Sequence, residues 1–181
     1  MADFNQEQLN RIKQTLNQPE GSFEANVSIA AIYIDIVQSS SLTLKHDPFT
    51  LSKIYKAFIN ETVTVMDCFC NLIHSDIQGD GVLGIFEIDC TSKLNEIINC
   101  AKNLSGMVRL INIELAKMEC AQIPVGIGIS YGAAFVMQAG NERFNNKVWI
   151  GNVVNEAVKM SSIAGRNGVP EIIIGNNMFK C

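Results

Sequence analysis

No stretch of the 181-residue sequence approaches the roughly 20 consecutive apolar residues that a membrane-spanning helix needs. The first residues also lack the basic start and apolar core of a secretory signal. We therefore expect a protein with no membrane span and a cytoplasmic location.

Basic residues are few as well. Fourteen lysines and arginines stand against eighteen aspartates and glutamates, which gives a net charge of −4. Binding to nucleic acid regardless of its sequence requires a basic surface, so nucleic acid is not expected as a partner. Small phosphorylated molecules remain possible, because bound metal ions can supply positive charge.

Histidine is scarce too, with two residues in the chain, and Cys68-Phe69-Cys70 does not have the spacing of a zinc site. The six cysteines mostly lie in apolar stretches, which predicts buried, reduced thiols. The rest is an ordinary globular composition, 48% hydrophobic and 18% charged. We expect a helix and linker in residues 1–25 and one folded domain in residues 26–181.

The pattern of apolar residues predicts helices and strands in mixed order. Residues 4–17 are amphipathic, and we expect this helix to pack on the domain. Asp47-Pro48, a cap followed by a first-turn proline, predicts the start of a helix that ends near Asp67. Further helices are expected at 91–118, capped by Thr91, and at 153–163, with strands at 27–36, 69–77, 82–88, 124–130, 133–138 and 171–174 and a short strand ending at 150. This order predicts an α+β fold with one mixed sheet and helices packed on one face.

Two aspartates are associated with strand-like runs. Asp35 lies at the end of an apolar strand, and Asp80 lies in Gly79-Asp80-Gly81, a hairpin signal. A carboxylate in such an apolar strand costs free energy unless it is paired or bound to metal. Brought together at neighbouring strand ends, the two carboxylates can hold a pair of divalent cations, and paired metals catalyse phosphoryl and nucleotidyl transfer.

Two more groups of polar residues accompany the aspartates. Ser39 and Ser40 follow Asp35 and offer hydroxyl and backbone N–H donors that can cradle phosphates. Asn155 and Lys159 lie one turn apart on the helix expected after Gly151. Taken alone, this last pair is more typical of a solvated helix surface than of a site.

Together these segments resemble the catalytic domain of class III nucleotidyl cyclases. Residues 33–40 resemble the first metal motif of that family, and Gly79-Asp80-Gly81 resembles the second. Residues 126–132 resemble the strand pair that follows, and residues 150–157 resemble the transition-state helix. The resemblance covers residues 27 to about 175, with the four motifs in the family's order.

The resemblance implies a head-to-tail homodimer with active sites at its interface. Asp35, Asp80 and the backbone carbonyl of Ile36 would bind two Mg²⁺ or Mn²⁺ ions. Asn155, reaching across from the partner chain, would orient the ribose of a nucleoside triphosphate. Lys159 stands where the family has a transition-state arginine, and lysine keeps the charge but loses the bidentate fork.

The positions that read the base depart from the best-known adenylate cyclases. Asp76 stands where those enzymes have lysine, and Val148 stands where they have aspartate or threonine. An ionised aspartate only accepts hydrogen bonds, so Asp76 suits the N–H groups of guanine, uracil or cytosine better than adenine N1. Tyr33 replaces a frequent phenylalanine and could pack on a base, although a core tyrosine is an equally good interpretation.

A compact cyclase domain with an altered base pocket is similar to the pyrimidine cyclases of bacterial anti-phage (Pycsar) systems. We therefore predict cyclisation of UTP, with CTP next, to a second messenger. Two alternatives stay open. One is a guanylate or adenylate cyclase, and the other is an inactive cyclase fold that binds nucleotide, which Lys159 in place of arginine keeps possible.

Overall fold

The computed structural model describes residues 6–17, 25–140, 143 and 145–179. These residues form, in order, α1 (Gln6–Leu16), β1 (Ala25–Ile36), the short 3₁₀ helix η1 (Ser39–Leu44), α2 (Pro48–Asp67), β2 (Leu72–Gln78), β3 (Gly81–Glu87), α3 (Ser92–Lys117), β4 (Val125–Gly140), β5 (Asn145–Ile150), α4 (Asn152–Ile163), β6 (Ile172–Ile174) and η2 (Asn176–Phe179). None of the helices in this part of the chain combines the length and apolarity needed to span a bilayer.

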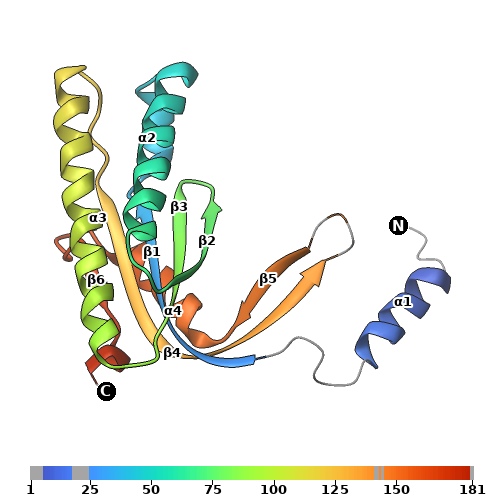
Figure 1. The fold of residues 1–181 in the computed structure, drawn as a ribbon. Helices are drawn as coiled ribbons and strands as arrows, with labels where there is room; N and C mark the ends of the chain where they lie inside the picture. Colours follow the sequence, from blue (N-terminus) through green and yellow to red (C-terminus); the bar gives the residue numbers. More distant parts are fainter. Residues whose placement is uncertain (1–5, 18–24, 141–142, 144, 180–181) are drawn as a thin grey trace.

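The strands form one sheet in the order β2-β3-β1-β4-β5, with β6 added beside β4 (Figure 1). All neighbours are antiparallel except β6, which runs parallel to β4. The predicted α+β class with a mixed sheet is confirmed. Asp47 also caps α2 as predicted, because its Oδ1 accepts hydrogen bonds from the N–H groups of Phe49 at 2.9 Å and Thr50 at 3.2 Å. Thr91 precedes α3, but its side chain makes no capping hydrogen bond.

The helices cover both faces of the sheet, so the prediction of a single covered face is wrong for α4. Alternate residues of β1 point to opposite faces. Ile32 and Ile34 belong to the core cluster that includes residues of α2 and α3. Ile29, Ala31 and Tyr33 belong to a second cluster that α4 joins through Val153 and Ala157.

Strand β4 is a single strand where two strands were predicted. Tyr131 and Gly132 do not interrupt it, because β1 offers a continuous partner: Tyr131 pairs with Ala30 and Gly132 with Ile29. The far half of β4 pairs with β5, and these two strands extend as an arm away from α2 and α3 (Figure 1). One strand therefore belongs both to the core and to the arm.

The sheet curls until its two ends meet. Strands β2 and β5 lie at opposite ends of the strand order, yet the rings of His74 in β2 and Trp149 in β5 are 6.0 Å apart between centroids. The edges are thus joined by side chains, at a contact that we call the His74–Trp149 seam.

Two other expectations need correction. Helix α1 is present, but none of its residues is buried, so the expected packing on the domain is not found. The expected Asp3 cap lies outside the described residues. Among the described cysteines, Cys68, Cys70 and Cys90 are exposed free thiols, and Cys100 alone is fully buried.

Candidate active site

The structure brings the carboxylates of Asp35 and Asp80 together. Asp35 lies near the end of β1, and Asp80 lies in the tight turn that joins β2 to β3. Gly79 makes this turn possible with φ +66, a left-handed conformation that glycine adopts at little cost. Because Ile34 of β1 pairs with Val82 of β3, the turn lies beside the end of β1.

The pKa of Asp35 is raised to about 6. Burial is the largest cause, followed by the negative charge of Asp80 and a hydrogen bond between the two carboxyl groups. The positive charge of Arg166 and a hydrogen bond from the backbone N–H of Ile36 act in the opposite direction. Two carboxyl groups this close disfavour double ionisation until a cation compensates them.

The carboxylate pair fits a divalent cation. Oδ2 of Asp80 is buried and has no hydrogen-bond partner in the described structure, although a buried charged oxygen is costly to leave unpaired. Carboxylate and carbonyl oxygens are the donors that Mg²⁺ and Mn²⁺ prefer. The described residues contain no group of three or more His, Cys, Asp or Glu side chains placed to hold a metal. A cation here would therefore complete its shell with backbone, substrate and water oxygens.

Arg166 is a residue of this site that the sequence did not point to. Its Nη2 lies 3.5 Å from Oδ2 of Asp35, and the two side chains are 24% and 26% exposed. Its Nη1 donates hydrogen bonds to the backbone carbonyls of Ser161 at 2.7 Å and Ala164 at 3.1 Å. The guanidinium is thus held between the end of α4 and the carboxylate pair, 131 positions from Asp35 in the chain, and no local sequence pattern marks it.

Tyr33 lies on the same face as Asp35 and is 9% exposed. Its hydroxyl passes directly over Gly81, where any side chain would collide with it. Burial raises the pKa of this hydroxyl, and the charges of Asp35, Asp80 and Asp76 raise it further. Tyr33 is therefore a core residue that also lines the acidic cluster, and its packing on a base stays a prediction.

Ser39 and Ser40 lie in η1, and Ser39 is close to another residue, Tyr55 of α2. Gln38 begins this segment in a left-handed conformation with φ 55. Burial raises the pKa of the Tyr55 hydroxyl, the charges of Asp80 and Asp35 raise it further, and a hydrogen bond with Ser39 acts in the opposite direction. The carbonyl of Ser40 accepts from Thr43 at 2.7 Å, and Ser40 itself is exposed.

The two expected base-reading residues lie on either side of the His74–Trp149 seam. Asp76 is exposed on β2, two residues after His74, and accepts a hydrogen bond from Gln78 Nε2 at 2.9 Å. Val148 precedes Trp149 on β5 and is 40% exposed. Neither ring of the seam was singled out from the sequence, although Trp149 is the one tryptophan of the chain.

Asn155 and Lys159 are exposed on α4, and no described contact links them to the carboxylate pair of the same chain. The helix itself is fixed firmly. Gly126 and Gly128 of β4 approach its backbone so closely that a Cβ at either position would collide with it. Ser161 of α4 also donates to the carbonyl of Gly126 at 2.9 Å. The two polar side chains are thus presented outward from a rigid support.

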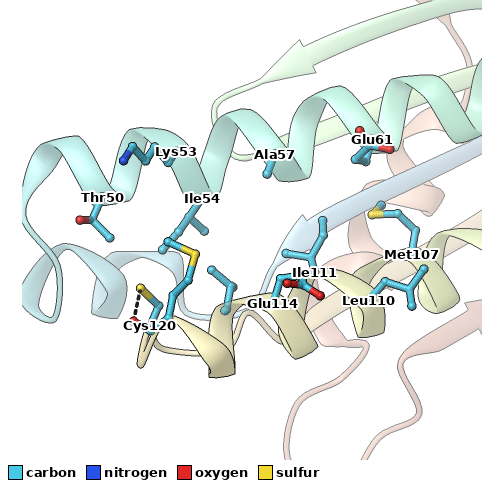
Figure 2. Close-up of a pocket in the computed structure, with 12 residues that line it drawn as sticks. Thr50, Lys53, Ile54, Ala57, Glu61, Met107, Leu110, Ile111, Glu114 and Cys120 are labelled. Atoms are coloured by element: carbon cyan, nitrogen blue, oxygen red, sulfur yellow. Dashed lines mark hydrogen bonds between the residues drawn. The ribbon is translucent and has the colours of Figure 1, made fainter.

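A separate apolar groove runs between α2 and α3 (Figure 2). It has a volume of about 630 Å³ and is lined by residues such as Ile54, Leu110 and Met118. Its lining includes none of the residues expected to bind metal or nucleotide. The groove is therefore distinct from the carboxylate pair.

Comparison with known families matches this arrangement. The family described as "Adenylate and Guanylate cyclase catalytic domain" matches residues 22–172. The chain belongs to this family. The match includes β1 with Asp35, the turn with Asp80 and all of α4.

Two relatives are similar to this chain in sequence, and one solved structure is similar to it in fold. A uridylate cyclase of Treponema porcinum is 34% identical over 154 residues, covering 84% of this chain and 54% of that protein. A uridylate cyclase of Gulbenkiania mobilis is 31% identical over 147 residues, covering 76% and 57%. The chain thus spans little more than half the length of these relatives. The structure of the adenylyl cyclase CyaB from P. aeruginosa has the same fold, with a TM-score of 0.77 at 15% identity, covering 87% of this chain and 81% of that one.

Proposed function

We propose that this protein is a nucleotidyl cyclase that converts a pyrimidine nucleoside triphosphate, UTP ahead of CTP, to the 3′,5′-cyclic monophosphate and pyrophosphate. The observation that carries the proposal is the pair formed by Asp35 and Asp80, in which Oδ2 of Asp80 is buried and has no hydrogen-bond partner in the described structure. In the reaction the ribose 3′-oxygen bonds to the α-phosphorus, and the bond from that phosphorus to the pyrophosphate leaving group breaks.

The carboxylate pair and the Ile36 carbonyl would hold two divalent cations, Mg²⁺ or Mn²⁺. Bound there, such ions lower the pKa of the 3′-hydroxyl and neutralise the charge of the triphosphate. The donors around Ser39 and Ser40, next to Asp35 in the chain, are suited to the phosphates. The charge of Lys159 would stabilise the transition state, with less geometric precision than an arginine.

We further propose that the active unit is a homodimer whose two chains share each active site. Asn155 and Lys159 support this because they are exposed on a rigid helix and have no described contact with the carboxylate pair of their own chain. In a head-to-tail dimer, each α4 would face the carboxylate pair of the other chain.

The preference for a pyrimidine rests on Asp76, Val148 and Tyr33, and on the relatives named uridylate cyclases. The Asp76 carboxylate accepts hydrogen bonds, which suits N3–H of uracil or the amino group of cytosine. Guanine is the second candidate, because it also offers N–H groups to Asp76. The cyclic product would act as a second messenger in defence against phage.

The test is incubation with Mn²⁺ and an equimolar mixture of ATP, GTP, CTP and UTP, with the products resolved by mass. Cyclic UMP as the main product is expected. Cyclic GMP or cyclic AMP in its place would overturn the pyrimidine assignment while leaving the cyclase assignment intact. No cyclic product from folded, dimeric protein that binds Mn²⁺ would contradict the activity itself and favour an inactive nucleotide-binding fold.

A further inference from the structure

Arg166 places a positive charge directly beside the carboxylate pair. The ion pair with Asp35 is long, at 3.5 Å between Nη2 and Oδ2. It uses one end of the guanidinium only, since Nη1 is engaged by the carbonyls of Ser161 and Ala164. Arginine carries five N–H donors, so this side chain keeps donors available on the side that faces the carboxylates.

The surrounding backbone is built to hold this arginine in place. Gly126 pairs with Asp35 across β1 and β4, and a Cβ on Gly126 would lie 3.1 Å from Arg166 Nη1. Gly165, at φ +67, turns the chain at the end of α4, and the carbonyl of Arg166 accepts from Val169 N–H at 2.9 Å. Two backbone carbonyls therefore hold the guanidinium, in a space that a side chain at position 126 would restrict.

We propose that Arg166 binds the polyphosphate tail of the nucleotide, and that its contact with Asp35 is a resting state from which a divalent cation releases it. This inference rests on the proposed nucleotide site. A cation that takes Oδ2 of Asp35 removes the partner of Nη2. The freed donors then face phosphate oxygens brought in with the cation, and guanidinium matches phosphate in a bidentate geometry.

The ion pair predicts two opposite effects of removing the charge. In Arg166→Gln, Mn²⁺ alone should bind about 3- to 10-fold more tightly, because the guanidinium no longer competes with Mn²⁺ for Asp35. The same variant should bind inorganic tripolyphosphate with Mn²⁺ about 10- to 100-fold more weakly, because charge-assisted hydrogen bonds are lost. A residue that only supports the end of α4 would weaken both.

The matched control is Arg109→Gln, which removes the same charge from an exposed position of α3. Mn²⁺ binding is followed by the electron paramagnetic resonance signal of the free ion, and tripolyphosphate binding by calorimetry. Arg109→Gln should leave both affinities within about 2-fold. Arg166→Lys keeps the charge without the bidentate geometry of arginine. It should bind tripolyphosphate with an affinity between those of the parent protein and Arg166→Gln. It also serves as the test variant if Arg166→Gln does not fold.

Equal tripolyphosphate affinities in the parent, Arg166→Lys and Arg166→Gln proteins would overturn the proposal, as would weaker Mn²⁺ binding by a folded Arg166→Gln. Tripolyphosphate has no base and no ribose, so this result does not depend on whether the protein cyclises a nucleotide. Absence of a cyclic product together with the expected tripolyphosphate result would contradict the proposed cyclase activity and support the proposed phosphate site.

Discussion

The hydroxyl of Tyr33 lies over Gly81 so closely that a methyl group at position 81 would occupy its place. This contact joins the wall of the acidic cluster to the hairpin that carries Asp80. Gly81→Ala should therefore displace Tyr33 and lower the free energy of unfolding by about 1–3 kcal/mol.

Gly106 provides the control for this substitution. It lies in α3 with open space around its Cβ position, so Gly106→Ala should stabilise the protein by about 0.5–1 kcal/mol. Urea unfolding of both variants measures the difference. Equal effects of the two substitutions would mean that Tyr33 moves aside without cost.

Neutralising either carboxylate should abolish Mn²⁺-dependent turnover while the dimer persists. Asp35→Asn and Asp80→Asn each remove an anionic oxygen donor with almost no change in side-chain size. They should therefore weaken cation binding and leave the fold intact. Product formation, Mn²⁺ binding and light scattering are the measurements, with Asp67→Asn at the end of α2 as the control. Full activity in either site variant would contradict the two-metal assignment.

The pKa of about 6 for Asp35 predicts a pH dependence of metal binding. Below about pH 6 a proton occupies the Asp35 carboxylate and competes with the cation. Mn²⁺ affinity should therefore rise as the pH increases from 5 to 7. The folded pKa lies above the ordinary value of 3.8, so in metal-free protein this group's contribution to stability should fall as the pH rises from about 4 to 6. Mn²⁺ titrations at several pH values measure the change in affinity. The rise in affinity between pH 5 and 7 should be absent in Asp35→Asn.

Lys159→Ala should lower turnover more than it lowers binding of the triphosphate. The charge is expected to act on the transition state, and an interaction of that kind affects kcat rather than substrate affinity. Single-turnover rates and nucleotide affinities separate the two effects. Lys102→Ala on α3 is the control, and unchanged turnover in Lys159→Ala would make Lys159 an ordinary surface residue.

Asp76→Asn should lower kcat/KM for UTP by about 10- to 100-fold, because a charge-assisted hydrogen bond to the base is replaced by a neutral one. Tripolyphosphate affinity should stay unchanged, since that ligand has no base. Gln78→Ala is an informative companion, because it frees Asp76 from its 2.9 Å hydrogen bond without removing the carboxylate. A uniform loss for all four nucleotides in Asp76→Asn would argue against base reading.

Local signals predicted the parts of this fold that depend on neighbouring residues. Asp47-Pro48 marked the start of α2 because a cap and a first-turn proline act within one helical turn. Gly79-Asp80-Gly81 likewise marked the hairpin. The division of β4 at Tyr131-Gly132 was wrong, because a single glycine in the sequence cannot show that β1 supplies an unbroken partner.

Features that depend on distant contacts were missed. The placement of α4 on the opposite face follows from Gly126 and Gly128, whose missing side chains matter only once the helix lies against them. Arg166 reaches Asp35 only through the turn after α4. The carboxylate pair could be expected because strand ends gather polar groups, but its counter-ion could not.

The His74–Trp149 seam closes the curled sheet with one ring contact and no described backbone ladder between β2 and β5. A tilted aromatic pair contributes about 0.5–1.5 kcal/mol, far less than a run of backbone hydrogen bonds. We therefore expect the curled sheet to separate more easily at the His74–Trp149 seam than between strands joined by backbone hydrogen bonds. Since Asp76 lies on β2 and Val148 on β5, a movement of the β4–β5 arm relative to β2 would change the separation of these two residues.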